Sequence, residues 1–302
     1  MRQALTTWCR SPKEASHRDA RYNRDFLRAS AMTPAIPSSI LDMLSLADPS
    51  WRPHLLAGLE ATARADPAYL PALVSQPYLP NGGRLFAAFA QPLDAVRYVL
   101  VGEGPYPRAE SATGVCFMDG AVGLLWSEKG FSVAVNRATS LRNFIKMLLV
   151  ADGQLAIEQT NGDALARISL KARAIGSTFI QTLMDLQANL TRHGFLLMNA
   201  ALVFRPHVAP IKDAKAWYPF LQAVLTALSD HAARMGTAPP TLVLWGKAAG
   251  QLDVLPSAAH FPKAISEHPY NLSFIANSAM QNLFAPLHLL QKQETVYPIN
   301  KG

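Results

Sequence analysis

Three polar or basic segments and one glycine–proline loop in this sequence lie next to short apolar runs, an arrangement typical of a ligand site. The apolar run at residues 98–101 leads into the glycine–proline loop at residues 102–107. Such a loop at the carboxyl end of a buried strand brings backbone N–H groups and one aromatic ring, here Tyr106, close to a ligand. Taken alone, this loop could equally be a plain connection. The other segments contain Asn199, Lys247 and His268.

Composition indicates a globular protein without a membrane segment. The chain has 302 residues, of which 50% are hydrophobic and 16% are charged. Its longest apolar stretch, residues 195–204, is interrupted by Asn199 and is too short to cross a bilayer. Cys9 and Cys116, its two cysteines, can build neither a disulfide framework nor a four-cysteine metal site. We therefore expect a cytoplasmic protein.

The positive charge is concentrated at the amino terminus. The net charge is +7, and residues 1–31 hold seven basic and three acidic side chains, a net of +4. We expect residues 1–31 to form a flexible basic extension and residues 32–302 to form a single domain. An extended gene start before Met32 is the simplest explanation of this segment. A phosphate-contacting arm is the functional alternative, and the acidic residues disfavour a targeting peptide.

Apolar periodicity predicts strands that alternate with helices. Strands are predicted at residues 98–101, 195–199, 241–245 and near 264–266. Helices are predicted around residues 40–44, 51–63, 85–89, 141–149 after a Thr139 or Ser140 cap, 177–193, 213–236 after an Asp213 cap, and 280–290. Residues 151–177 are too polar to assign. This alternation predicts an α/β fold, a three-layer αβα sandwich with a central, mainly parallel four-stranded sheet.

In sequence order, five segments resemble motifs of the uracil-DNA glycosylase superfamily, most closely its uracil-excising family. The family's Gly-Gln-Asp-Pro-Tyr-His loop corresponds to residues 102–107, and its Gly-Leu-Cys-Phe to residues 114–117. Its Leu-Leu-Asn-Ala, Leu-Leu-Trp-Gly and His-Pro-Ser-Pro-Leu-Ser motifs correspond to residues 197–200, 243–246 and 268–273. The resemblance runs from about Trp51 to Lys292. It implies a monomeric enzyme without cofactor or metal that flips a base from double- or single-stranded DNA and hydrolyses its N-glycosidic bond.

The resemblance also implies roles in holding a base. Phe117 matches the ring that stacks on the flipped base, and Asn199 the amide that reads the base edge. His268 matches the donor to the base oxygen on which charge develops. Tyr106 matches the ring that crowds C5 and excludes thymine, and Gly102 opens the base-binding loop. The structural alternatives are a core phenylalanine, a strand-end cap and a histidine with a purely structural role.

Other matched residues are expected to contact DNA outside the base pocket. Leu272 corresponds to the wedge that fills the space left by the flipped base. Four residues lie where the family's phosphate-contacting loops occur: Ser140, Gly246, Lys247 and Ser273. Lys247 replaces a small residue and could add one ionic phosphate contact.

The sequence departs from the family at the catalytic acid. The family's water-activating Asp falls on Gly104, which has no side chain, and Glu103 replaces the preceding Gln. Gly-Glu-Gly-Pro also resembles the first motif of the iron–sulfur uracil-DNA glycosylases, although this chain lacks their four cysteines. Glu103 is therefore the candidate catalytic carboxylate. The alternative is an inactive DNA-binding module or accessory factor, since Pro107 is shared with poxviral members that also serve as polymerase accessory factors.

The same departure suggests a further substrate. Gly104 and Pro107 leave less side-chain volume at the pocket floor than the family residues do. A bulky modified base, such as some phages use, could fit, which would make the protein a defence enzyme. Tyr106 opposes a large C5 substituent unless its ring moves.

Overall fold

Four parallel strands form the central sheet, in the order β4-β1-β5-β6. Their bounds are β1 Tyr98–Gly102, β4 Phe195–Asn199, β5 Thr241–Trp245 and β6 Lys263–Ser266. Gly102 pairs with Asn199, and Trp245 pairs with Ser266. Because the strands are parallel and in this register, every candidate motif leaves the sheet at the same edge. The predicted four-stranded parallel sheet is confirmed.

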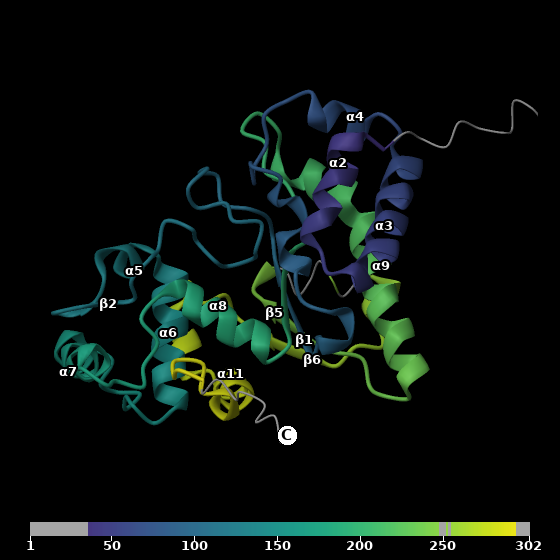
Figure 1. Cartoon of the computed structure of the whole chain (residues 1–302). Coiled ribbons are helices and arrows are strands. Elements are labelled where there is room, and N and C mark those ends of the chain that lie inside the picture. The colour runs from purple at the N-terminus through teal and green to yellow at the C-terminus, as the bar shows by residue number, and fades with distance from the viewer. Residues whose placement is uncertain (1–35, 248–251, 253–254, 294–302) are drawn as a thin grey trace, which may run out of the picture. The chain divides into compact units, whose positions relative to one another are not determined.

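The computed structural model describes residues 36–247, 252 and 255–293 (Figure 1). The described residues all belong to one compact unit, residues 36–302. The predicted basic extension, residues 1–31, lies outside the described residues. Within the described ranges, no helix is long and apolar enough to cross a membrane.

The two faces of the sheet carry separate cores, because neighbouring residues of a strand point to opposite faces. Val99 and Val101 of β1 belong to one core, while Leu100 belongs to the other. Helices α3 (Arg52–Ala65) and α9 (Pro210–Met235) cover the first face. Helices α6 (Thr139–Ala151), α8 (Leu183–Arg192) and α11 (Ser278–Phe284) cover the second. Figure 1 shows these two groups on either side of the sheet, which confirms the three-layer αβα fold.

Shorter elements complete the described part of the chain. They are α2 (Ser38–Asp42), η1 (Met43–Leu46), η2 (Pro49–Trp51), α4 (Tyr69–Val74), η3 (Arg84–Phe89), η4 (Leu93–Ala95), β2 (Trp126–Ser127), β3 (Gly130–Phe131), α5 (Val133–Arg137), α7 (Gly162–Arg173), η5 (Pro256–Ala258), η6 (Leu272–Ala276) and η7 (Ala285–Leu287). The β2–β3 ribbon and α7 were not predicted. Helix α7 lies in the polar stretch that could not be assigned, and Asn161 caps its first turn.

Three predicted helix ends were wrong, each for a local reason. Helix α8 begins at Leu183 rather than at residue 177, because Thr182 and Asp185 form a capping box there. Helix α6 starts after Ala138 and has no side-chain cap, so neither Thr139 nor Ser140 serves as one. Helix α11 ends at Phe284, since a proline two residues on favours the 3-10 turn η7.

Asp213 is not the cap of α9 either. The helix begins at Pro210, where a missing N–H costs nothing. Asp213 lies one turn inside and is buried, and it accepts hydrogen bonds from Arg205 at 2.6 Å and from the Tyr69 hydroxyl at 2.8 Å. The ion pair therefore anchors α9 to the segment that follows β4.

Candidate active site

A cavity of about 210 Å³ opens at the carboxyl edge of the sheet. Loops that follow β1 and β6, the end of β4 and the last residue of β5 all contribute to its wall. Seven of the predicted site residues line it: Gly102, Glu103, Tyr106, Phe117, Ser140, Asn199 and His268. The fold thus brings together residues that are up to 166 positions apart in the sequence.

Gly102 lets the Asn199 side chain reach the cavity. A Cβ at position 102 would lie 2.7 Å from Asn199 Oδ1 and 2.5 Å from Cys116 Sγ, so the space permits only glycine. Asn199 is only 5% exposed, and its amide makes no hydrogen bond within the described ranges. A buried amide without a partner leaves donors and an acceptor for a ligand. Asn199 is therefore placed to read the edge of a planar polar group.

Phe117 is held in an uncommon backbone conformation. Its φ is 66°, in the left-handed region that a bulky residue rarely adopts. Its ring packs edge-on against Phe144 at 5.4 Å and Trp245 at 5.2 Å. These two rings are fixed in the core, so they set the orientation of Phe117 on the cavity wall. Such strain persists only where the surroundings enforce it, and it often marks a functional residue.

Cys116, next to Phe117, has a structural role. Its N–H donates to the Leu197 carbonyl oxygen at 3.0 Å, which ties residues 114–117 to β4. Burial raises the pKa of its thiol to about 12. The thiol is therefore protonated at neutral pH and is unsuited to nucleophilic attack.

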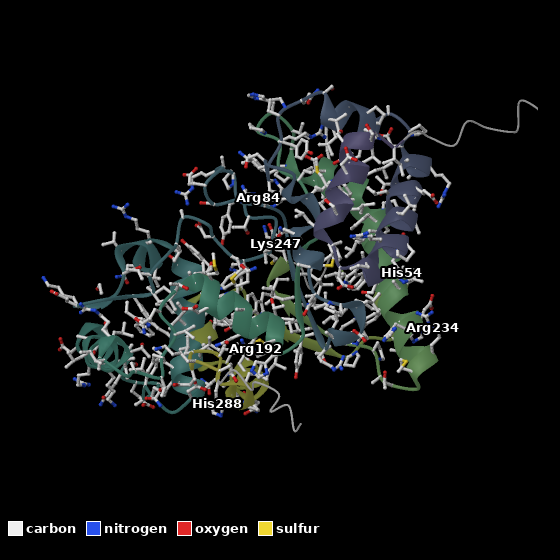
Figure 2. The ribbon with its side chains drawn as sticks, viewed as in Figure 1. His54, Arg84, Arg192, Arg234, Lys247 and His288 are labelled. Atoms are coloured by element: carbon white, nitrogen blue, oxygen red, sulfur yellow. The ribbon has the colours of Figure 1, made fainter. Side chains whose placement is uncertain are left out.

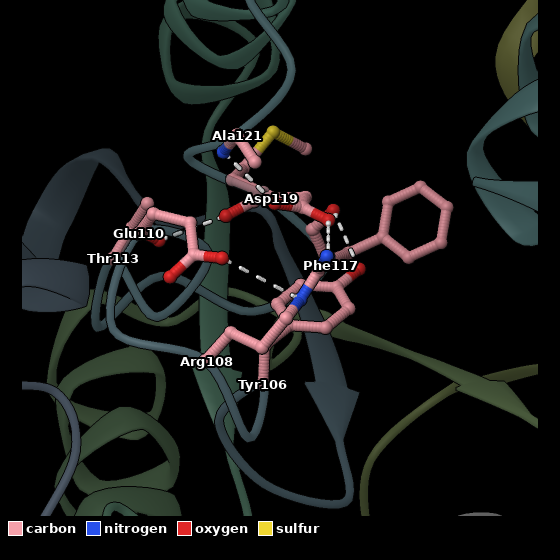
Figure 3. Close-up of polar contacts among 8 residues, drawn as sticks. Tyr106, Arg108, Glu110, Thr113, Phe117, Asp119 and Ala121 are labelled. Atoms are coloured by element: carbon pink, nitrogen blue, oxygen red, sulfur yellow. Dashed lines mark hydrogen bonds and ion pairs between the residues drawn. The ribbon is translucent and has the colours of Figure 1, made fainter. Parts of the chain in front are cut away.

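Tyr106 also lines the cavity and contacts the backbone of Phe117. Its hydroxyl donates to the Phe117 carbonyl oxygen at 3.5 Å, a long hydrogen bond. Burial, together with Cys116 and Asp119 nearby, raises the Tyr106 pKa above its usual value, so the hydroxyl stays protonated. Figure 3 shows this contact beside a second bridge between the same two segments, the Arg108–Asp119 ion pair of 3.4 Å.

The His268 side chain lines the cavity while much of its surface stays exposed, and its ring has a defined tautomer. Its Nδ1 accepts the Tyr270 backbone N–H at 3.1 Å, so the ring proton lies on Nε2. Partial burial lowers the His268 pKa, and the nearby Glu103 charge opposes that shift. A neutral imidazole with an Nε2–H can donate a hydrogen bond into the cavity.

Glu103 and Gly104 form the part of the wall where the family's acid is missing. Glu103 is exposed, and its charge acts on His268, so the two side chains lie near each other. A Cβ at position 104 would lie 3.7 Å from the Ala201 carbonyl oxygen, an ordinary contact. Gly104 is thus not required by space, and a side chain could be accommodated there.

The predicted DNA-contacting residues lie around this cavity. Leu272 begins η6 and is 70% exposed, so its side chain is free to contact a partner, although single exposed leucines are common. Ser140, in the first turn of α6, lines the cavity itself. Lys247 is exposed beyond β5, and Figure 2 shows it near the middle of the molecule with Arg84 above it.

Gly246 and Ser273 have further contacts of their own. Gly246 has φ of 59°, and a Cβ there would lie 2.9 Å from His268 Cβ, so it sets the position of the histidine. Ser273 is exposed and lies near Glu267. Partial burial alone would raise the Glu267 pKa, but hydrogen-bond donors that include Ser273 and Asn277 lower it.

Two site residues were not identified from the sequence. Trp245 lines the cavity, and its ring packs against the Phe117 ring. The sequence motif at residues 243–246 includes Trp245 but gives its side chain no role. Asn143 is fully buried in α6 and hydrogen-bonds the loop that follows His268. The sequence does contain a sign of this role. Asn143 lies in the apolar helix predicted at residues 141–149, where a buried polar group needs a hydrogen-bond partner.

Within residues 36–247, 252 and 255–293, no three histidine, cysteine or acidic side chains gather as a metal site would require. The cavity lining combines an aromatic ring, an amide, an imidazole and a carboxylate, contributed by Phe117, Asn199, His268 and Glu103. The cavity thus lies at the carboxyl edge of a parallel sheet, the place where open α/β folds commonly bind ligands.

Comparisons with known proteins identify the family. No protein-family model matches the chain. The chain is 28% identical over 246 residues to a uracil-DNA glycosylase of Corynebacterium glutamicum, covering 80% of this chain and 86% of that one. It is 28% identical over 197 residues to uracil-DNA glycosylase 1 of Streptomyces coelicolor, covering 65% and 68%.

A solved structure is more similar still. The crystal structure of wild-type UNG from Nitratifractor salsuginis is 37% identical, with a TM-score of 0.75, and the match covers 84% of this chain and 97% of that one. This identity over nearly the whole of a relative shows common descent. The chain belongs to the uracil-DNA glycosylase superfamily.

Proposed function

We propose that this protein flips a uracil or a modified base out of DNA and hydrolyses its N-glycosidic bond, leaving an abasic site. The observation that carries the proposal is the convergence of Phe117, Asn199 and His268 on one cavity of about 210 Å³. This volume is below the roughly 300–1,000 Å³ of drug-sized ligand sites and suits a single base. A base in a duplex reaches such a pocket only by flipping.

The three residues would hold the base and stabilise its charge as it leaves. The Phe117 ring offers a face for stacking, and the Asn199 amide offers both donors and an acceptor to the base edge. The His268 Nε2–H would donate to a base oxygen as the bond from C1′ to the base nitrogen breaks. The bonding electrons pass to the base, so a fixed donor stabilises the transition state more than the ground state.

Glu103 would act on the attacking water and on the sugar from which the base departs. A water oxygen forms the new bond to C1′ while the base departs, and its proton passes to the Glu103 carboxylate. The carboxylate also opposes the positive charge that develops on the sugar. Its place on the cavity wall, near His268, supports this role.

A DNA-binding module without activity is the second candidate. It is favoured by one observation, the absence of a side chain at Gly104, where the family's acid would stand. The candidate predicts tight DNA binding and no release of any base. A module that only binds DNA does not explain why the Asn199 amide lies in the pocket, buried and without a hydrogen-bond partner.

We also propose that a bulky modified base, such as some phages carry, is a candidate substrate, which would make the protein a defence enzyme. The open space beside Gly104, where a Cβ would meet only Ala201, supports this extension. The Tyr106 ring, which lines the cavity, opposes a large C5 substituent, so the ring would have to turn aside.

Three further proposals concern the whole chain. Residues 32–302 form the glycosylase domain and residues 1–31 a basic extension, a division that a truncated protein starting at Met32 would test. The protein acts as a monomer, which light scattering in solution would test. It works in the cytoplasm, where the free thiol of Cys116 stays reduced, and cell fractionation would test that location.

The deciding experiment is incubation with duplexes that each contain one uracil or one modified base, followed by alkaline cleavage at abasic sites. Release of uracil or a modified base by the wild type, with a strong loss in Asn199→Ala, is the expected result. Wild-type protein that binds these duplexes and releases no base supports the binding module instead. A matched control is Asn136→Ala, because that exposed amide lies in α5, away from the cavity lining.

A further inference from the structure

The short segment that carries Tyr106, residues 103–107, separates two cavities. Residues 103–105 line both the base pocket of about 210 Å³ and a second cavity of about 230 Å³, called the rear cavity below. Of the two cavities, Tyr106 lines the base pocket and Pro107 lines the rear cavity. The segment is therefore a wall with open space on both of its sides.

The backbone of this wall is weakly attached. Residues 104–107 make no backbone hydrogen bond within the described part of the chain. Gly104, at the start, has no Cβ to restrict rotation of the chain. Pro105 and Pro107 fix φ on either side of Tyr106, so this piece is stiff and moves as one body. A stiff piece that follows a glycine and lies between two cavities can shift as a unit.

Two side-chain contacts join the far end of the wall to the segment that carries Phe117. The Tyr106 hydroxyl donates to the Phe117 carbonyl oxygen at 3.5 Å, a distance at which a hydrogen bond adds little. Two residues further along both segments, Arg108 Nη2 lies 3.4 Å from Asp119 Oδ2 (Figure 3). Burial raises the Tyr106 pKa most; Asp119 also raises it and Arg108 lowers it, so both charges lie near the ring.

Asp119 is the fixed partner of this ion pair. Its side chain is 8% exposed, its Oδ1 accepts the Ala121 N–H at 2.9 Å, and its backbone forms a β-bridge with Ala112. Arg108 is 58% exposed, and its second acidic neighbour, Glu110, is also exposed and lies 4.0 Å from Nε. One guanidinium and two carboxylates give the cluster a net charge of −1. The cluster is thus suited to holding the loop rather than to binding an anion.

We propose that the Arg108–Asp119 ion pair is a latch that holds the Tyr106 ring in the base pocket and sets the size of the C5 substituent that the pocket admits. The inference rests on the proposed function, in which this ring crowds C5 of the flipped base. While the pair is closed, hydrogen at C5 fits better than a methyl group. When the pair opens, the wall shifts toward the rear cavity and the ring makes room. Arg108 and Asp119 are therefore positioning residues that do not touch the base.

Asp119→Asn is the sharpest test of the latch. The asparagine keeps an oxygen that accepts the Ala121 N–H, so the turn persists, but it removes the charge that holds Arg108. Arg108→Gln opens the pair from the other side and should have the same effect. The matched control is Glu110→Gln, which removes an exposed carboxylate from the same arginine and leaves the latch intact. Thermal unfolding verifies that all three variants fold.

The readout is binding to duplexes that contain one 2′-fluoro nucleotide of uracil or of thymine, each opposite guanine. The fluorine destabilises a cation-like sugar, so the base stays attached while fluorescence anisotropy measures Kd. The wild type should bind the uracil duplex more tightly. Asp119→Asn should lower the ratio of the thymine Kd to the uracil Kd by about fivefold, the scale of one partly exposed ion pair. Glu110→Gln should keep the wild-type ratio.

A double variant shows whether the latch acts through the ring. In a Tyr106→Ala background, Asp119→Asn should change the ratio no further, because the group that it positions is gone. A further fall in this background would place the effect of Asp119 elsewhere and overturn the proposal. Equal weakening of both duplexes by Asp119→Asn would also overturn it, since a purely structural role leaves the ratio unchanged.

The outcomes separate the latch from the proposed function. If the wild type prefers the uracil duplex and excises no base, the proposed function fails while the ratios still decide the latch. If the wild type excises uracil and all the variants keep its ratio, the latch alone fails. A wild type that binds both duplexes equally also overturns the latch, because the closed pair then excludes nothing.

Discussion

The Asn143 side chain ties helix α6 to the loop that carries His268. Its Nδ2 donates to the Pro269 carbonyl oxygen at 2.8 Å, and a second, longer bond of 3.3 Å reaches the Tyr270 carbonyl oxygen. Tyr270 in turn donates its N–H to His268 Nδ1. One buried amide therefore connects the helix that bears Ser140 to the residue that fixes the histidine tautomer.

Replacing Asn143 should weaken catalysis more than its stability cost explains. Asn143→Ala leaves buried carbonyl oxygens unpaired, which costs about 1–3 kcal/mol of unfolding free energy. A shift of the His268 loop should also lower kcat by about tenfold or more, since small misplacements are costly. The matched control is Asn189→Ala, because Asn189 is a buried amide that bonds the Leu289 and Gln291 carbonyl oxygens. Equal kcat values in the two variants, at similar stability, would mean that Asn143 is only structural.

Glu103→Gln should keep DNA binding and lower the excision rate by about a hundredfold, the usual scale for a positioned acid–base group. The amide has the same shape and cannot accept the proton from water. Single-turnover excision and anisotropy binding measure the two quantities. Glu110→Gln is the control, since Glu110 is an exposed acid on the same loop. If Glu103→Gln excises at the wild-type rate, another group activates the water.

Gly104→Asp should restore a carboxylate where the family has one. A Cβ at this position makes only ordinary contacts with Ala201, so the variant should fold, which thermal unfolding can verify. We expect excision to rise by about tenfold or more and to depend less on Glu103. Gly104→Ala adds the Cβ without the acid and separates the effect of volume from that of charge. A rate that falls equally in both variants would show that the space beside Gly104 must stay open.

Leu272→Ala should slow excision from duplex DNA by about tenfold and change excision from single strands little. The wedge replaces stacking lost on flipping, which costs a few kcal/mol in a duplex and is absent in a single strand. Ile265→Ala removes another exposed apolar side chain and should leave both rates unchanged. Equal losses for Leu272→Ala on the two substrates would rule out a wedge.

His268 should titrate below its ordinary pKa of about 6.5. Burial lowers the pKa, so the neutral ring and its contribution to stability persist above 6.5 and are lost as pH falls through the folded-state value. Glu103→Gln removes the charge that opposes this shift, so the His268 pKa should fall further. An NMR titration of the ring, assigned with His268→Gln, measures both values. A His268 pKa above 6.5 in the wild type contradicts the neutral-donor mechanism.

Much of the site was predictable because its residues end apolar strands. Asn199 follows four buried residues of β4, and the glycine–proline loop follows β1, so strand patterns alone place both at a sheet edge. The resemblance then added Phe117 and His268 with their expected roles. Helix ends were predicted less well, as Asp213 shows, because a side chain that could cap a helix locally was instead buried in an ion pair with Arg205.

By itself, the sequence determined the parallel sheet, the order of the motifs and the residue types available for stacking, hydrogen bonding and catalysis. Strand periodicity and glycine content are local properties of the chain, so both can be identified from the sequence alone. The tertiary structure alone decided which side chains meet. The position of the Asn199 amide in the cavity, the His268 tautomer and the Asn143 bridge all depend on contacts that the whole fold creates. Such contacts follow from packing of the whole fold, which no local pattern encodes.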